Sequence, residues 1–215
     1  SDVCSSDLIA GPGQTSAPLT AAGERLLPAI KPGNGPRAVP EKQINDPLSI
    51  MCDPMGFPRQ LLYELRPFQV VQTPDSLLML YMFEKRWRVI WTDGRPLPAN
   101  PEPRWYGYSV GRWEDELTFV VTTVGTDPRT WLDNAGNPHS ADLKVTERYR
   151  LVNRDLVELS VTIDDPAVYT RPWLGRDKLA LRRVPARTDF MEMICSPTET
   201  AAYKKLVDEQ NAKRR

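Results

Sequence analysis

From Phe68 onward, apolar and polar residues alternate with a period of two, which is the pattern of half-buried β-strands. Turn sequences such as Thr73-Pro74-Asp75-Ser76 and Asp93-Gly94 separate these runs at hairpin spacing. The pattern predicts strands at 68–72, 77–83, 87–91, 105–113, 117–124, 143–152, 156–163, 179–184 and 190–194. Eight or nine short strands with mostly hairpin-length connections favour a mainly β fold, a single antiparallel lipocalin-like β-barrel over residues 67–195. Such a barrel has room for one small ligand.

Two helices are expected outside the barrel. Within 19–66, the stretch Leu19–Ile30 has Thr20 as a helix cap, and a proline-rich N-terminal arm follows it. After the last strand, Ser196-Pro197-Thr198-Glu199 combines a cap, a first-turn proline and an acidic residue. These signals predict a C-terminal helix and tail over 196–215.

The first residues change how the cysteines are counted. Residues 1–8 resemble a translated sequencing-adapter fragment, so Cys4 is set aside and the native N-terminus, with any signal peptide, is expected to be missing. The rest of the 1–18 segment is a flexible leader by composition. Cys52 and Cys195 then form an even pair, which predicts one disulfide; two buried free thiols are the alternative.

Length, charge and apolar runs limit the size of the fold and the classes of binding partner. The chain has 215 residues, enough for one domain with a real core. Its 28 basic and 28 acidic side chains cancel, so charge gives no indication of a nucleic-acid partner. No apolar run approaches the roughly 20 residues of a membrane-spanning helix, so no such segment is expected. The oligomeric state is left open.

Aromatic side chains concentrate between Arg86 and Arg148, which hold five of the six tryptophans. Aromatic residues at this density line ligand cavities, although they also fill β-barrel cores. The expected ligand-binding residues are Trp91, Arg104, Trp105, Tyr106, Tyr108, Trp131 and Tyr149.

The only histidine, His139, lies in a loop of the same region that is rich in carboxylates. A carboxylate that orients an imidazole is an arrangement of general acid–base catalysis, whereas a backbone-bonded loop histidine is the plainer interpretation. One histidine with no nearby cysteine does not fit the usual zinc sites, and the aspartate spacing does not fit an EF-hand, so no metal or other cofactor is expected. The candidate catalytic residues are His139, Asp133, Asp142, Glu147 and Arg129.

Glu147 is the most informative single position in the strand 143–152. It shares one face of the strand with Leu143, Val145, Tyr149 and Leu151, while Arg148 and the other residues of the opposite face are polar. Its carboxylate is therefore expected to point inward. A buried carboxylate needs a partner or a raised pKa. It is therefore either a cavity acid or base, or half of an ion pair with an arginine of another strand. On the strand 87–91, Trp87, Val89 and Trp91 share one face and Arg88 takes the other.

Four segments carry a resemblance: CDPMGFPR (52–59), WTDGR (91–95), WYGYSVGRWE (105–114) and NPHS (137–140). With them, most of residues 40–205 resembles a family of predicted secreted proteins from environmental bacteria that has no established activity. The resemblance implies a single β-rich domain and a secreted or periplasmic location, and it transfers no catalytic residue.

Motifs for acyl-serine chemistry, nucleotide binding and thiol catalysis are all missing from the sequence. Three functions stay open. The first is a secreted barrel that binds a small apolar, aromatic or sugar-derived ligand. The second is a cofactor-independent hydrolase, lyase or isomerase that uses His139. The third is a cell-envelope interaction module that docks a partner through its proline-rich arm and C-terminal helix.

Overall fold

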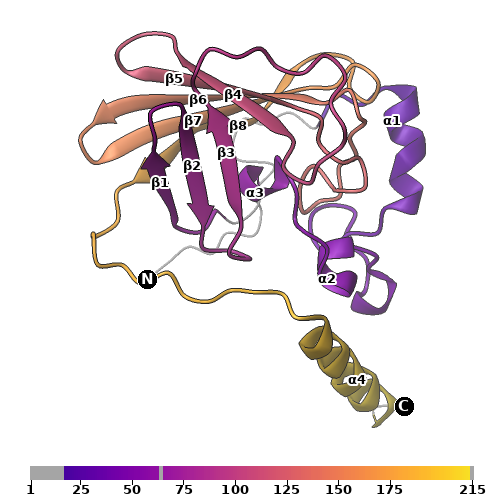
Figure 1. The fold of residues 1–215 in the computed structure, drawn as a ribbon. Coiled ribbons are helices and arrows are strands. Elements are labelled where there is room, and N and C mark those ends of the chain that lie inside the picture. The colour runs from indigo at the N-terminus through magenta and orange to yellow at the C-terminus, as the bar shows by residue number, and fades with distance from the viewer. Residues whose placement is uncertain (1–16, 63–64, 214–215) are drawn as a thin grey trace.

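One curled sheet dominates the computed structural model, which describes residues 17–62 and 65–213 (Figure 1). Each strand pairs with its neighbours in sequence, so the spatial order is the chain order. The strands are β1 (Phe68–Gln72), β2 (Ser76–Tyr81), β3 (Trp87–Trp91), β4 (Tyr108–Trp113), β5 (Thr118–Val124), β6 (Lys144–Asn153), β7 (Leu156–Asp164) and β8 (Trp173–Arg182). The prediction of a mainly β fold is confirmed.

The prediction of a closed antiparallel lipocalin-like barrel is wrong. The sheet is an open half-barrel, because its end strands β1 and β8 each pair with one neighbour only. It is also mixed, since β3 and β4 run parallel and meet at Ile90–Ser109 and Trp91–Val110. A parallel pair needs a long crossover in place of a hairpin, and the proline-rich residues 92–107 provide it.

An N-terminal segment fills the concave side of the sheet. Helix α3 (Arg59–Leu62) and the residues before it place Phe57, Leu61 and Leu62 against the sheet, each at most 3% exposed. They join the inward-facing residues of the strands in one hydrophobic core: Met79, Tyr81, Ile90, Phe119, Val121, Val145, Leu159, Val161 and Ile163. The half-barrel interior is therefore largely packed side chains.

The N-terminal helices follow from local signals. The predicted helix is present as α1 (Ala21–Leu26), and the Thr20 hydroxyl caps it by accepting the Gly23 N–H. Pro28 ends its regular part, and a single 3-10 turn, η1 (Leu27–Ala29), continues it. The arm then holds a second turn, η2 (Glu41–Gln43), and the short helix α2 (Pro47–Met51).

The C-terminal part runs from β8 as an extended segment. The strand predicted at 190–194 is absent; Met193 instead makes one isolated parallel bridge to Phe83. The predicted disulfide is confirmed, since Cys52 and Cys195 lie at bonding distance with Cα atoms 5.3 Å apart. The predicted helix is also confirmed as α4 (Pro197–Lys213), which projects away from the sheet (Figure 1). Among the described residues, none of the helices has the length and apolar character to cross a membrane.

Candidate functional site

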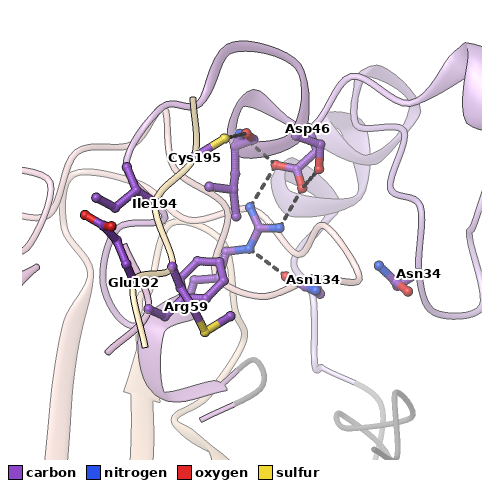
Figure 2. A pocket seen from close by; sticks show the side chains of 11 residues that line it. Asn34, Asp46, Arg59, Asn134, Glu192, Ile194 and Cys195 are labelled. Carbon is purple, nitrogen blue, oxygen red and sulfur yellow. Dashed lines mark hydrogen bonds and ion pairs between the residues drawn. The ribbon is translucent and has the colours of Figure 1, made fainter. Parts of the chain in front are cut away.

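A pocket of about 450 Å³ opens where the N-terminal helices, the 125–143 loop and the C-terminal segment meet (Figure 2). Its volume lies within the roughly 300–1,000 Å³ of small-molecule sites. The polar side chains that line it are Asn34, Asp46, Ser49, Arg59, Asn134 and Glu192. The apolar ones are Leu48, Phe83, Met193, Ile194 and Cys195.

The floor of this pocket is a buried ion pair. Arg59 donates through Nη1 and Nη2 to the two oxygens of Asp46, at 2.8 and 2.6 Å, and the two side chains are 3% and 8% exposed. The Nε–H of Arg59 donates to Asn134 Oδ1 at 2.8 Å. These contacts use three of the five N–H groups of a guanidinium. The floor is therefore rigid, close to neutral, and retains donor groups.

Local structure fixes both members of the pair. Asp46 is the N-cap of α2, where its carboxylate accepts the Leu48 N–H at 3.1 Å and the Ser49 hydroxyl at 3.1 Å. Arg59 begins α3, and its guanidinium lies 5.4 Å from the ring centre of Trp131. The charged floor thus joins the first residue of α3 to the N-cap of α2.

The C-terminal segment forms the apolar wall and is tied down at three places. The disulfide fixes Cys195 to the residue that ends α2. The Glu84 N–H donates to the Met193 carbonyl at 2.5 Å. Lys85 Nζ donates to the Phe190 carbonyl at 2.6 Å. These ties place Met193 and Ile194 over the pocket.

His139 is buried in the 125–143 loop, with 4% of its surface exposed. Its Nδ1 lies 3.0 Å from the Ser140 carbonyl oxygen, and because a carbonyl only accepts, we assign the proton to Nδ1. Nε2 lies 2.8 Å from the Thr130 hydroxyl oxygen, and that hydroxyl donates to the Asp127 carbonyl at 2.8 Å. Burial lowers the pKa of His139, although its bond to Ser140 and the charge of Asp165 oppose this effect. The imidazole is therefore neutral at pH 7.

We expect the ring protons of His139 to titrate with a midpoint below the 6.5 of an unperturbed histidine, measured by NMR on the single histidine of the chain. Because the unfolded chain binds this proton first, the stability from neutral His139 is present above pH 6.5 and declines as the pH falls below it. In His139→Gln, the resonance disappears and this part of the acid slope is lost. A midpoint at or above 6.5 would show that the buried neutral state is wrong.

Glu147 points inward, as the alternation predicts, and is fully buried. Its two oxygens accept from Arg88 Nη1 and Nη2 at 2.9 and 2.6 Å, and from the Tyr149 hydroxyl at 2.6 Å. Arg88 also donates to Ser109 and Thr123, whose hydroxyls lie 2.9 Å apart. The buried face of β3 therefore holds Arg88 together with Ile90, and Trp87 on the opposite face is 62% exposed.

Burial and mutual attraction shift the pKa values of the groups around Glu147. Burial opposes the charge of Arg88, but the attraction of the Glu147 carboxylate outweighs it and raises the pKa of Arg88. Burial, with the charge of Glu147, raises the pKa of Tyr149 well above its usual range. Burial likewise raises the pKa of Tyr81 to about 12. The arrangement is that of the inter-strand ion pair; a catalytic role for Glu147 stays a prediction.

The other expected catalytic residues do not gather around His139. Asp133 is buried and accepts from the backbone and side chain of Asn137, and burial raises its pKa. Asp142 is exposed. Arg129 is 70% exposed at its side chain and pairs with Asp127 at 2.6 Å. Their catalytic roles stay predictions.

The expected ligand-binding aromatics are not among the residues that line the pocket. Three of them lie under arginines, as the stacks Arg95–Trp91, Arg104–Tyr108 and Arg129–Trp105, with distances of 3.6, 4.0 and 4.7 Å from guanidinium carbon to ring centre. Tyr106 packs against the core, and Trp131 lies beneath Arg59. No ligand contact tests these residues, so their binding roles also stay predictions.

The sequence reasoning did not identify the residues that form the pocket floor. Asp46 had a usable signal, because Asp46-Pro47 combines a capping residue with a first-turn proline. Arg59 and Asn134 had none, since each is a single polar residue in a short or irregular segment with no periodicity. Their meeting is a product of the tertiary structure.

Comparisons with known protein families, proteins and structures find no relative of this chain. The chain matches no protein-family model, no curated protein and no solved structure. Within residues 17–62 and 65–213, no group of three or more histidine, cysteine, aspartate or glutamate side chains is placed to hold a metal ion.

Proposed function

We propose that this protein binds a small neutral hydroxylated molecule, a sugar or sugar derivative, in the pocket between α2, α3 and the C-terminal segment. The observation that carries the proposal is the pocket itself: about 450 Å³, with a fixed polar floor and an apolar wall. A ligand-binding role keeps the first of the functions that the sequence left open and moves it from a barrel cavity to this pocket.

The charge balance of the floor favours a neutral ligand. Asp46 already neutralises Arg59 through two hydrogen bonds, so an anion would have to compete with a bound carboxylate. Glu192 adds a further negative charge to the lining. Neither the neutralised Arg59 nor the Glu192 carboxylate would attract an anionic ligand.

The mixture of donors and acceptors favours hydroxyl groups. The guanidinium retains N–H donors, the Asn34 and Asn134 amides both donate and accept, and Glu192 accepts. A hydroxyl donates and accepts at once, so each ligand hydroxyl can match either kind of group. Phe83 and Ile194 offer the apolar surface on which the C–H face of a sugar ring packs.

We further propose that the protein works in an oxidising compartment, outside the cytosol. Disulfides persist in secreted and periplasmic proteins and are rare in the cytosol. The Cys52–Cys195 pair, which joins segments 143 positions apart, supports this location.

We expect Asn34→Ala to weaken ligand binding about three- to tenfold, the effect of losing one hydrogen bond. Asn34 is exposed, so the change leaves the core intact. Ligands are found by saturation-transfer NMR against neutral mono- and disaccharides, uronic acids and aromatic glycosides, and affinities are measured by titration calorimetry.

The matched control is Asn100→Ala, the same substitution at an exposed position of the 92–107 connection, which should bind like the unmodified chain. Preference for uronic acids over neutral sugars would contradict the charge argument. If the two substitutions weaken binding equally, the pocket is not the binding site. If neither the unmodified chain nor the Asn100→Ala control binds any ligand of the panel, the proposed function is wrong.

A further inference from the structure

The outward side of strands β1–β4 carries a run of apolar side chains, with the polar residues Gln69, Ser76 and Arg112 at its other outward positions. Directly paired residues of antiparallel strands share a face. Met79 pairs with the buried Arg88, so the alternate pairs Leu78–Val89 and Leu80–Trp87 point outward. The same side continues through Val71, opposite Leu78, and through Trp91 beside Val110. We call this set the apolar outer face: Val71, Leu78, Leu80, Trp87, Val89, Trp91 and Val110.

This face does not belong to the hydrophobic core. None of its members is among the buried core residues or the partly buried side chains that pack against them. Trp87 is 62% exposed, the other six members are half-buried, and the Arg95 guanidinium lies over the ring of Trp91. In Figure 1, β1–β3 lie at the front of the molecule, and no described helix lies in front of them. A contiguous apolar surface of this kind marks an interaction site.

The other half of the same sheet provides an internal comparison. On β6 and β7, the outward positions pair as Lys144–Asp164, Thr146–Thr162, Arg148–Ser160 and Arg150–Glu158. They are all polar, as expected of a sheet side that faces water. The apolar outer face therefore differs from the solvated part of its own sheet, although the strand geometry is the same.

Charges at the two ends of the β2–β3 pair are opposite in sign. Lys85 and Arg86 lie at the turn between the strands and outnumber the buried Glu84 there. At the other end Arg95 pairs with Asp93 at 2.6 Å, so Asp75 carries the net negative charge. A two-fold axis perpendicular to the strands would place the basic end of one copy against the acidic end of another. The net charge of zero adds no repulsion between copies.

We propose that the protein forms a symmetric homodimer in which the apolar outer face packs on the same face of a second copy. A two-fold interface requires a self-complementary surface, and a flat apolar sheet side with opposite charges at its ends meets that requirement. Two sheets that pack face to face in this way form a sandwich about 10 Å thick. Trp87, near the basic end, fills the space beside the partner's acidic end.

The test measures mass by sedimentation and light scattering from low to high micromolar concentration, where the unmodified chain should approach twice its 24.4 kDa. Val89→Glu places a charge at the centre of the face and should weaken dimerisation at least tenfold. Thr162→Glu, an outward position of β7, is the matched control and should leave the dimer unchanged.

Charge exchange identifies the partner without disturbing the fold. Arg86→Glu alone and Asp75→Arg alone should each weaken the dimer several-fold, and the double variant should restore it, because both ends exchange sign together. A monomer at every concentration overturns the proposal, and so does a dimer that tolerates Val89→Glu. Binding of monomer to anionic lipid vesicles through the same face also overturns it, in favour of a lipid surface.

Discussion

Replacing Glu147 with alanine is expected to lower the free energy of unfolding by about 3–5 kcal/mol, because the change leaves Arg88 charged, buried and without its carboxylate. At roughly 2–4 °C per kcal/mol for a domain of this size, the melting temperature should fall by about 6–20 °C. Urea unfolding followed by circular dichroism measures the loss directly.

The matched control is Glu114→Ala, which removes the partner of Arg148 on the surface, where both side chains are more than 40% exposed. An ion pair exposed to water contributes little to stability, so this variant should unfold almost normally. The double variant Arg88→Met with Glu147→Leu should recover most of the loss, since it removes both charges together. Equal losses at Glu147 and Glu114 would show that the Arg88 pair is not sealed from water.

Removing the disulfide is expected to have the second large effect. Cys52 and Cys195 are separated by 143 positions, and a loop of that length corresponds to at most about 5 kcal/mol of chain entropy in the unfolded state. We expect Cys52→Ser with Cys195→Ser to lower the urea midpoint and to abolish ligand binding, because the segment that carries Met193 and Ile194 loses its strongest tie.

Reduction of the unmodified protein serves as the control, since it breaks the same bond without changing any side chain volume. Its urea midpoint and ligand affinity should match those of the double serine variant. If neither reduction nor substitution changes the midpoint, the disulfide does not stabilise the fold. If the midpoint falls and ligand affinity is retained, the C-terminal wall is not part of the binding site.

Much of the sheet could be predicted because alternation is a local property. Strands as different as Phe68–Gln72 and Leu156–Asp164 carry the period of two, and they lie where that period places them. The closed barrel could not be predicted reliably, since closure depends on whether β1 and β8 meet. The sequence places the next strand at 105–113, whereas β4 begins at Tyr108, and the length of the connection after Trp91 was not used as evidence for the parallel crossover.

The orientation of β3 shows a second limit. Trp87, Val89 and Trp91 alternate with Arg88 and Ile90, and the larger apolar set would ordinarily mark the buried side. The structure buries Arg88, because its guanidinium pairs with the Glu147 carboxylate and donates hydrogen bonds to the hydroxyls of Ser109 and Thr123. The sequence of one strand does not reveal a charge partner on another strand, so the choice of face was decided by tertiary pairing.

The candidate site was the least predictable part. The sequence pattern favoured aromatic and ionisable residues between Arg86 and Arg148, whereas the pocket takes its floor from Asp46 and Arg59 and its wall from Met193 and Ile194. Segments so far apart in sequence meet only through the fold and the disulfide. Composition shows where aromatic and ionisable residues concentrate along the sequence, whereas a pocket depends on which segments pack together in the fold.

The most direct test of the account is a ¹H–¹⁵N NMR titration with the neutral sugar that binds best in the ligand panel. We predict that shift changes cluster on Asn34, Arg59, Asn134 and Ile194, and that reduction of the disulfide removes them. Changes that cluster instead on Trp91, Trp105 and Tyr108, with none around Arg59, would contradict the pocket as the binding site and return the function to the aromatic surface.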